Sequence, residues 1–434
     1  MWPKAIRRLF SSKVASTLSP SEAILVPLAQ LNPAGLGIPE SVLKVAYTLK
    51  GKGFSAYIVG GAVRDLLLQQ SPKDFDLVTD ASPVQIKALF PRSRIIGRRF
   101  PIVHVYTKHE VLDVSSFSLD ENSKDQSKPN TASKIYNIMD QDSRKRDFTC
   151  NALYLDPLEK TVHSYHGALE HLKAKCLVPI GDPEIRLKED PVRIIRGIRI
   201  AAKAQLTIEA ELAHVMQQNA HFLLEQSCSR LFDEWAKVIY SKAAYPCFLY
   251  LKKLNILPFL HPITKIVDQY TADVALRIVN NTLEQTDKRL LNEQTISLGF
   301  VFAALLWPLI QQQRQQLQSQ GLRPAHALHE AIVMVMNQKE LSNSSIPNKN
   351  LNYMREIWHM QLQLERTYST LKIKKLLVQP RFRAAYDFYL LRAQSGDADL
   401  EKAQQWTEWI QCLPQEKTSS AAPKKIAKPR RASA

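Results

Sequence analysis

The sequence is poor in cysteine, and its few cysteines suit neither disulfides nor zinc. Five occur among 434 residues. Their number is odd, and no two have the Cys-x-x-Cys spacing of zinc sites. This pattern argues against a small disulfide-stabilised secreted domain and favours a reduced, cytoplasmic location. A chain of this length can bury a large core without such cross-links.

Long apolar runs are also missing. The longest, 298–310, is shorter than the roughly 18 residues that a membrane-spanning helix needs, and Pro308 interrupts it. We therefore expect a buried core helix there and no spanning segment. Residues 1–38 form a basic N-terminal arm whose first 21 positions contain no acid. A flexible arm is the simplest interpretation; peripheral contact with a membrane surface and a transit peptide are the alternatives.

Acidic residues are too few to balance the basic ones. Lys and Arg number 58 against 41 Asp and Glu, which leaves a net charge of +17. This excess favours a polyanionic partner, such as nucleic acid or an anionic membrane face, over a generally basic protein with no such partner. At the C-terminal end, 416–434 has six basic residues and one acid. Residues 413–434 are therefore predicted to be a disordered cationic tail.

Hydrophobic periodicity divides the chain into two kinds of structure. Short apolar strands alternate with short helices over 39–170, and the helical period dominates from 171 onward. We predict an α+β fold in which a head with a mixed sheet, 39–170, precedes a helical neck, 171–245, and a helical body, 246–412. Residues 118–134 lack aromatic residues and are predicted to be a surface loop.

Two aspartates, Asp74 and Asp76, flank Phe75 beside a predicted strand, 75–78. Alternation along a strand would place both carboxylates on one face, about 6–7 Å apart at the backbone. Carboxylates this close repel each other unless cations lie between them, and Mg²⁺, or Mn²⁺ in its place, prefers such ligands. An isolated pair of this kind is, however, more often a solvated strand end.

A Gly60-Gly61 turn makes the pair more informative. A predicted strand, 57–59, runs into the turn and a predicted helix, 62–70, leaves it. Two glycines here allow backbone N–H groups to approach a phosphate, and Arg64 can offer it a planar guanidinium. A phosphate-binding turn a dozen residues before paired carboxylates indicates metal-dependent phosphoryl or nucleotidyl transfer.

Further acidic and basic residues have open assignments. Asp113, on a predicted hairpin strand, is either a third metal ligand or an ordinary edge residue. Asp147 follows a basic cluster, 144–146, that should keep it ionised, and a simple helix-start ion pair is its alternative. Asp190 can cap a helix beginning at Pro191, along which a basic stripe recurs at Arg193, Arg196, Arg199 and Lys203. A solvated charged face is the ordinary explanation of such a stripe.

Four motifs together resemble the class II branch of the polymerase-β-like nucleotidyltransferases, the family of bacterial poly(A) polymerases and tRNA CCA-adding enzymes. In the family's order they are Gly60-Gly61-x-Val63-Arg64-Asp65, Asp74-x-Asp76, Arg144-x-Arg146-Asp147-Phe148-Thr149-x-Asn151 and Glu189-Asp190-Pro191-Val192-Arg193. The resemblance implies Asp74, Asp76 and Asp147 as catalytic residues and Asp74, Asp76 and Asp113 as ligands of two Mg²⁺ ions. It implies ATP binding by Gly60, Gly61, Arg64, Arg146, Asn151, Asp190, Arg193 and Arg196. Asp190 and Arg193 would recognise adenine, so that no template is needed.

Three segments favour the poly(A) polymerases within this family: 97–104, 229–234 and 380–387 resemble runs of these enzymes. The resemblance therefore implies a monomeric enzyme that adds AMP from ATP to RNA 3′ ends. Its RNA would bind the basic neck and tail, and RNA-decay machinery would be a partner. A CCA-adding tRNA nucleotidyltransferase is the first alternative, and an inactive nucleotide- or RNA-binding module is the second. Whether Asp113 or Asp147 completes the metal ligands stays open.

Overall fold

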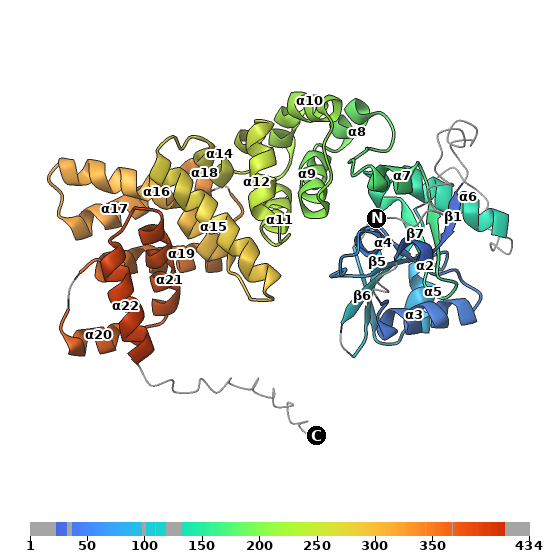
Figure 1. The fold of residues 1–434 in the computed structure, drawn as a ribbon, viewed down its shortest axis with the longest axis horizontal. Helices are drawn as coiled ribbons and strands as arrows, with labels where there is room; N and C mark the ends of the chain where they lie inside the picture. The colour runs from blue at the N-terminus through green and yellow to red at the C-terminus, as the bar shows by residue number, and fades with distance from the viewer. Residues whose placement is uncertain are drawn as a thin grey trace, which may run out of the picture. The chain divides into compact units, whose positions relative to one another are not determined.

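The computed structural model describes residues 23–32, 37–97, 101–108, 110–118, 132–342, 344–366 and 368–412 (Figure 1). The chain forms two compact units. Unit 1 comprises Met1–Tyr270, Leu283–Leu298 and Asn337–Ile346, and unit 2 comprises Thr271–Thr282, Gly299–Met336 and Pro347–Ala434. Most of the predicted arm, the whole predicted tail and residues 98–100 of the run 97–104 lie outside the described residues. The described part of the predicted arm is not a flexible arm, because Ile24–Pro27 pairs as a strand with Thr161–Ser164 in the sheet of the head and Val26 is buried. The predicted domain boundaries at 170, 245 and 412 stay predictions.

A mixed sheet organises the head in unit 1, as predicted. Its strand order is β1-β8-β7-β2-β3-β6-β5-β4, and β3 and β6 are parallel while the other neighbours are antiparallel. The strands are β1 (Ile24–Pro27), β2 (Tyr57–Val59), β3 (Asp76–Thr79), β4 (Ser93–Ile96), β5 (Ile102–Tyr106), β6 (Val111–Ser116), β7 (Leu153–Asp156) and β8 (Thr161–Ser164).

Short helices connect these strands. They are α2 (Leu28–Leu31), α3 (Glu40–Gly51), α4 (Gly61–Leu67), α5 (Pro83–Leu89), α6 (Ala132–Arg144), the 3₁₀ helix η1 (Thr149–Asn151) and α7 (Ala168–Lys173). The sequence specifies the start of α5, because Ser82 accepts from the Gln85 backbone while the Gln85 side chain accepts from the Ser82 N–H. The buried face of the sheet holds apolar side chains such as Leu77, Val114 and Leu155.

Several sequence-based boundaries are wrong. The helix predicted over 62–70 spans Gly61–Leu67. The strand predicted over 75–78 begins at Asp76, because β2 ends at Val59, the partner of Asp76, and the chain turns away at Gly60. Asp74 therefore precedes the strand instead of alternating with Asp76 along it. The loop predicted over 118–134 also ends early, since α6 begins at Ala132; residues 119–131 lie outside the described residues.

Helices make up the rest of unit 1. They are α8 (Pro183–Glu189), α9 (Val192–Ala204), α10 (Ala210–Gln218), the 3₁₀ helix η2 (Ala220–Glu225), α11 (Cys228–Ile239), α12 (Ala244–Lys253), α13 (Leu257–Leu260), α14 (Pro262–Asp268) and α18 (Lys339–Ser342). Helix α9 starts at Val192, one residue later than predicted, and buries Val192, Ile195 and Ala202. Its packing against α11 and α12 explains why so many of its apolar residues are buried.

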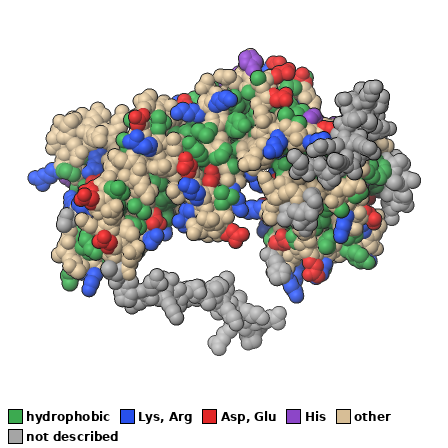
Figure 2. Space-filling model, in the orientation of Figure 1, with side chains coloured by type: hydrophobic (Ala, Val, Ile, Leu, Met, Phe, Trp, Pro, Cys, Tyr) green, Lys and Arg blue, Asp and Glu red, His purple; other side chains and the backbone are tan. Residues whose placement is uncertain are grey.

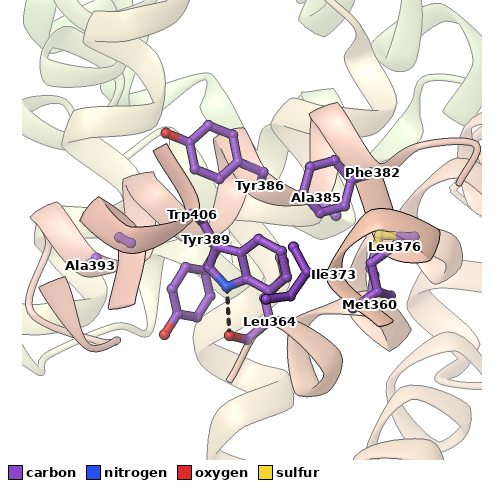
Figure 3. Close-up of a cluster of buried hydrophobic side chains, with 11 residues drawn as sticks. Met360, Leu364, Ile373, Leu376, Phe382, Ala385, Tyr386, Tyr389, Ala393 and Trp406 are labelled. Carbon is purple, nitrogen blue, oxygen red and sulfur yellow. Dashed lines mark hydrogen bonds between the residues drawn. The ribbon is translucent and has the colours of Figure 1, made fainter. Parts of the chain in front are cut away.

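Unit 2 is also helical. It contains the first part of α15 (Asp273–Leu291), then α16 (Leu298–Ser319), α17 (Pro324–Met336), α19 (Asn348–Leu364), α20 (Thr370–Leu377), α21 (Phe382–Gln394) and α22 (Leu400–Cys412). Figure 3 shows one buried cluster, in which the Trp406 indole N–H donates to the Leu364 carbonyl at 3.0 Å. The core helix predicted over 298–310 is confirmed by α16, which contains Pro308. None of the helices in the described part of the chain combines the length and hydropathy of a membrane span.

Candidate active site

Carboxylates meet where β3 and β6 run side by side. Asp76, the first residue of β3, is the register partner of Asp113 on β6. Side chains at paired positions of neighbouring strands lie on the same face, and the strands are about 4.8 Å apart. Asp74 lies two residues before Asp76; both residues reach solvent, although protein surrounds much of the Asp76 carboxyl group, and Asp113 is half-exposed. The sheet thus places two of the predicted metal ligands next to each other, with the third immediately upstream.

The electrostatics of Asp76 show that negative charge dominates here, because the charge of Arg146 offsets only part of the effects that raise the pKa of Asp76. Displacement of water by the surrounding protein, followed by the charges of Asp113 and Asp74, raises the pKa of Asp76 to about 6, although Arg146 opposes the rise. No group of three His, Cys, Asp or Glu side chains within the described ranges is arranged to hold a metal by itself. Magnesium sites at phosphates commonly use one or two carboxylates and complete the shell with substrate oxygens and water. The crowded aspartates fit such a cation.

His104 also contacts one of these carboxylates, although the sequence motifs gave it no role at this site. His104, on β5, is the register partner of Asp113, and its Nε2 lies 3.3 Å from Asp113 Oδ1. A row of polar side chains therefore crosses three adjacent strands from Asp76 through Asp113 to His104. The predicted hairpin contained the clue, because its register decides which residues face each other across the turn.

The glycine turn lies at the end of β2, close to this row. Gly60 has φ of +67° and ψ of −127°, a conformation that side-chain-bearing residues rarely adopt. A Cβ on Gly60 would lie 3.6 Å from Arg146 Nη1, and a Cβ on Gly61 would lie 3.4 Å from Arg64 Nη2. Two guanidinium groups therefore adjoin a turn whose backbone can be approached closely.

The two arginines are anchored differently. Arg64 is buried, and its Nε and Nη2 donate to Asp65 Oδ1 at 3.0 and 2.7 Å while Nη1 donates to Asn151 Oδ1 at 2.9 Å. Arg146 donates from Nη2 to Asp142 and lies over the Tyr154 ring, whose hydroxyl also accepts from Nε. Arg64 is therefore a support of the turn, whereas Arg146 carries its charge toward Gly60 and Asp76.

Asp147 has partners of its own and is linked to Arg64 through Asn151. Its Oδ1 accepts from the Phe148 N–H at 2.9 Å and from Asn151 Nδ2 at 3.0 Å, and its Oδ2 is 2.9 Å from Arg196 Nη2. Burial favours the neutral carboxyl, but Arg196 and the hydrogen bonds from Asn151 and Phe148 hold the pKa of Asp147 below its usual value. Its charge is thus already balanced by protein groups.

The basic stripe on α9 is paired with carboxylates from several elements. Arg193 donates to Glu189 and to the Arg186 carbonyl, Arg196 pairs with Asp147, Arg199 lies 3.9 Å from Glu234, and Lys203 pairs with Asp65 at 2.8 Å. Asp190, just before α9, accepts twice from Arg230 at 2.9 Å. On the face drawn in Figure 2, Lys and Arg side chains are likewise scattered among Asp and Glu. The described stripe is therefore an ion-paired surface. It differs from both a row of cations without acidic partners and a charged face that contacts only solvent.

Family models match three parts of the chain. They are the Poly A polymerase head domain over 56–178, the "Probable RNA and SrmB- binding site of polymerase A" over 205–266 and the Polymerase A arginine-rich C-terminus over 320–434. A solved structure of the Bacillus stearothermophilus CCA-adding enzyme in complex with CTP has the same fold, with a TM-score of 0.58 at 21% identity over 86% of this chain and 80% of that one. The fold and the head define a nucleotidyltransferase.

Proteins of similar sequence identify one family within the nucleotidyltransferases. Poly(A) polymerase I of Salmonella typhi is 34% identical over 409 residues, 90% of this chain and 87% of the relative. Poly(A) polymerase I of Escherichia coli O6:H1 is 33% identical over 91% of this chain and 87% of its own length. A CCA-adding enzyme of Streptococcus uberis is 33% identical over 54% of this chain and 59% of its own. The chain belongs to the bacterial poly(A) polymerase family, which confirms the resemblance seen in its motifs.

Proposed function

We propose that this chain is a template-independent polynucleotide adenylyltransferase, which transfers AMP from ATP to RNA 3′ ends and releases pyrophosphate. The observation that carries the proposal is the register of Asp76 with Asp113 beside the Gly60 turn. The similarity to poly(A) polymerases over nine-tenths of the chain favours AMP as the unit added.

Asp76, Asp113 and Asp74 would hold the divalent cations, Mg²⁺ or Mn²⁺. When bound, two such ions lower the pKa of the attacking hydroxyl and neutralise the triphosphate of the nucleotide. We assign the third position to Asp113 and not to Asp147. Asp113 stands next to Asp76 on the neighbouring strand, whereas Asp147 is engaged by Arg196 and Asn151.

The triphosphate would lie against the glycine turn. The Gly60-Gly61 backbone leaves room for phosphate oxygens, and Arg146 brings a guanidinium nitrogen to the same place. Arg64 adds positive charge beside the turn, and Asp65 and Asn151 fix the orientation of its guanidinium group. Preorganised groups of this kind stabilise the charge that builds up on the leaving pyrophosphate without reorganising during the reaction.

Base selection would fall to the start of α9. Asp190 offers carboxylate oxygens and Arg193 offers N–H donors, which together suit the Watson–Crick edge of adenine. Arg230 and Glu189 hold these two side chains in place. Selection by protein side chains makes a template unnecessary. RNA is the proposed acceptor, consistent with the RNA-binding description of the model that matches 205–266; contact with RNA-decay machinery remains a prediction of the family resemblance.

A CCA-adding activity is the second candidate, because a CCA-adding enzyme matches about half of the chain at similar identity. Incubating the enzyme with Mg²⁺, one nucleoside triphosphate at a time and either a generic RNA or a tRNA lacking its terminal CCA separates the candidates. The proposal predicts long tails made with ATP alone on generic RNA. Addition that stops after C, C and A and requires tRNA would establish the alternative. Absence of incorporation would leave an inactive binding module.

A further inference from the structure

A continuous series of hydrogen bonds and ion pairs connects α9 with the support of the glycine turn. Each contact in it is 3.0 Å or shorter. The members, which we name the head–α9 circuit, are Arg196, Asp147, Asn151, Arg64, Asp65 and Lys203 in the order of their contacts. The first and last members belong to α9, so the helix itself closes the circuit.

The two ends of the circuit lie on one face of α9. Arg196 and Lys203 are seven residues apart, which is about two turns of helix. Residues at this spacing lie above one another on a helix surface. Two separate points along α9 are thus fixed to the head, one through Asp147 and one through Asp65. A helix held at two points cannot rotate or slide without breaking one of the contacts.

The packing beside the circuit gives independent evidence that α9 fits closely here. Gly197 follows Arg196, and a Cβ on Gly197 would lie 2.6 Å from Phe148 Cζ and 2.8 Å from Met216 Cε. Phe148 itself follows Asp147 and is buried. Only glycine leaves room for this ring, so the helix backbone and the Asp147 segment are in direct contact.

Burial makes the circuit sensitive to the loss of any member. Arg64, Asp65 and Asp147 are 5%, 2% and 7% exposed. Among the described contacts, Asp65 has two cationic partners, Arg64 and Lys203. Without Lys203, one oxygen of a buried carboxylate would lose its ion pair, and Asp65 and Arg64 would reorient to compensate.

We propose that Lys203 and Asp65 are positioning residues for nucleotide binding. They fix α9, which carries Arg193 and follows Asp190, relative to Arg64 and the glycine turn, and they act without touching the nucleotide. This inference rests on the proposed function, since it assumes that base and triphosphate bind at these two places. Its consequence is that a change at Lys203 alters both ATP binding and the choice of ATP over other nucleotides.

The test compares Lys203→Met, Lys203→Arg, Asp65→Asn and the double variant Asp65→Asn/Lys203→Met. We expect Lys203→Met to raise the KM for ATP and to lower the ratio of kcat/KM for ATP to that for CTP, each by about 10-fold, with kcat within about 3-fold of wild type. Lys203→Arg should keep both within about 3-fold. The double variant should resemble Asp65→Asn alone, because the ion pair of Lys203 is already lost when Asp65 is changed, whereas Asp65→Asn also disturbs the contacts with Arg64.

Lys188→Met is the matched control, because it removes a similar ion pair, Lys188 with Glu184 at 2.7 Å, from the neighbouring helix α8. It should leave the KM and the nucleotide ratio unchanged. If Lys203→Met lowers the melting temperature but preserves both values, the circuit only stabilises the fold and the inference is wrong. Asp65→Asn changes a buried side chain, so its kinetics are informative only if the variant folds. Lys203→Met and Lys203→Arg change a half-exposed side chain and therefore carry the test.

Equilibrium binding of ATP, measured by calorimetry, separates this inference from the proposed function. A wild type that incorporates no AMP would contradict the proposed function. Weaker ATP binding by Lys203→Met than by wild type and Lys188→Met would still support the positioning role. Equal binding by all three proteins would overturn it.

Discussion

Each unit contains a buried arginine held by carboxylates, and the two arginines have different surroundings. Arg392 in unit 2 is 1% exposed; it donates to Asp397 at 2.6 Å and to Gln361 and Glu365 at 3.0 Å, and it lies 4.3 Å over the Trp307 ring. These partners all belong to unit 2. Arg64 in unit 1 is held just as firmly, but its partners lead on to α9 and its guanidinium adjoins the glycine turn.

The two networks also differ in their relation to uncompensated charge. In unit 2, Arg314 and Arg392 face Glu365 and Asp397, and these arginines keep the pKa of Glu365 low despite its burial. In unit 1, the circuit lies near three aspartates that repel one another and raise the pKa of Asp76. Similar chemistry therefore stabilises a helical core in one unit and adjoins the proposed metal site in the other.

The largest expected contrast comes from removing one carboxylate charge in each unit. Asp76→Asn should reduce AMP incorporation by at least about 1,000-fold, because it would delete a ligand of the proposed metal site. The same change should raise the melting temperature in the absence of metal, since it relieves the repulsion from Asp113 and Asp74. Incorporation assays and thermal unfolding measure the two effects.

Asp397→Asn should do the reverse, lowering the melting temperature while the folded protein keeps its activity, because Asp397 accepts from Arg392 and Trp307 inside unit 2. Asp399→Asn, at an exposed position of unit 2, is the control for both variants and should change neither property. Normal incorporation by Asp76→Asn would contradict the assignment of the site.

Arg392→Met tests whether the arginine network of unit 2 contributes to stability and not to ATP binding. It removes a buried cation and leaves the half-buried Glu365 and Asp397 partly unpaired, so we expect a loss of up to about 3–5 kcal/mol in the free energy of unfolding. ATP affinity below the unfolding transition should not change, because no partner of Arg392 belongs to unit 1. Arg383→Met, which breaks an exposed pair with Asp387, should cost less than about 1 kcal/mol. Urea denaturation and calorimetric ATP titration give both quantities.

Gly197→Ala tests the close contact between α9 and the head. The added methyl group would meet Phe148 and Met216 at less than 3 Å, and relief of this overlap should cost about 1–3 kcal/mol. Because the shift also moves α9 relative to the circuit, the KM for ATP should rise. If Gly197→Ala is destabilised but binds ATP normally, the close packing of α9 at Gly197 is not needed to position the nucleotide.

A change in pH should affect the two networks differently. Asp76 has a pKa of about 6 without metal, so protons compete with cations below that pH, and metal affinity should fall by up to about 10-fold per pH unit. The pKa of Glu365 is lowered, so its stabilising charge is present above the ordinary glutamate pKa and is lost only as the pH falls through the lower folded value. Between pH 7 and pH 5, Mn²⁺ titrations should therefore weaken while unit 2 keeps this contribution to its stability. A metal affinity that stays constant between pH 7 and pH 5 would contradict this prediction.

Local patterns predicted the elements better than the contacts between them. The strand over 57–59 is observed with the predicted limits, and the glycine turn lies between a strand and a helix as expected. These features depend on neighbouring residues. The early end of β2, which excludes Asp74 from β3, depends on where the chain leaves the sheet, and periodicity contains no information about that.

The circuit shows the same limit for the site. Periodicity indicated a basic face on α9, but the acids that pair with it come from positions such as Asp65, Asp147 and Glu234, far away in the sequence. Likewise, the contact of His104 with Asp113 follows from a strand register that the turn determines. Motif order identified the family, whereas the division of labour between Arg64 and Arg146 required the folded chain.

Metal binding by three single variants tests the central assignment most directly. Mn²⁺ titration of Asp76→Asn, Asp113→Asn and Asp147→Asn, each checked for folding by circular dichroism, distinguishes the sheet carboxylates from the carboxylate held by Arg196. The account predicts that Asp76→Asn and Asp113→Asn lose binding together with AMP incorporation, while folded Asp147→Asn retains its metal affinity. Retention of metal affinity by Asp113→Asn and its loss in Asp147→Asn would contradict the account.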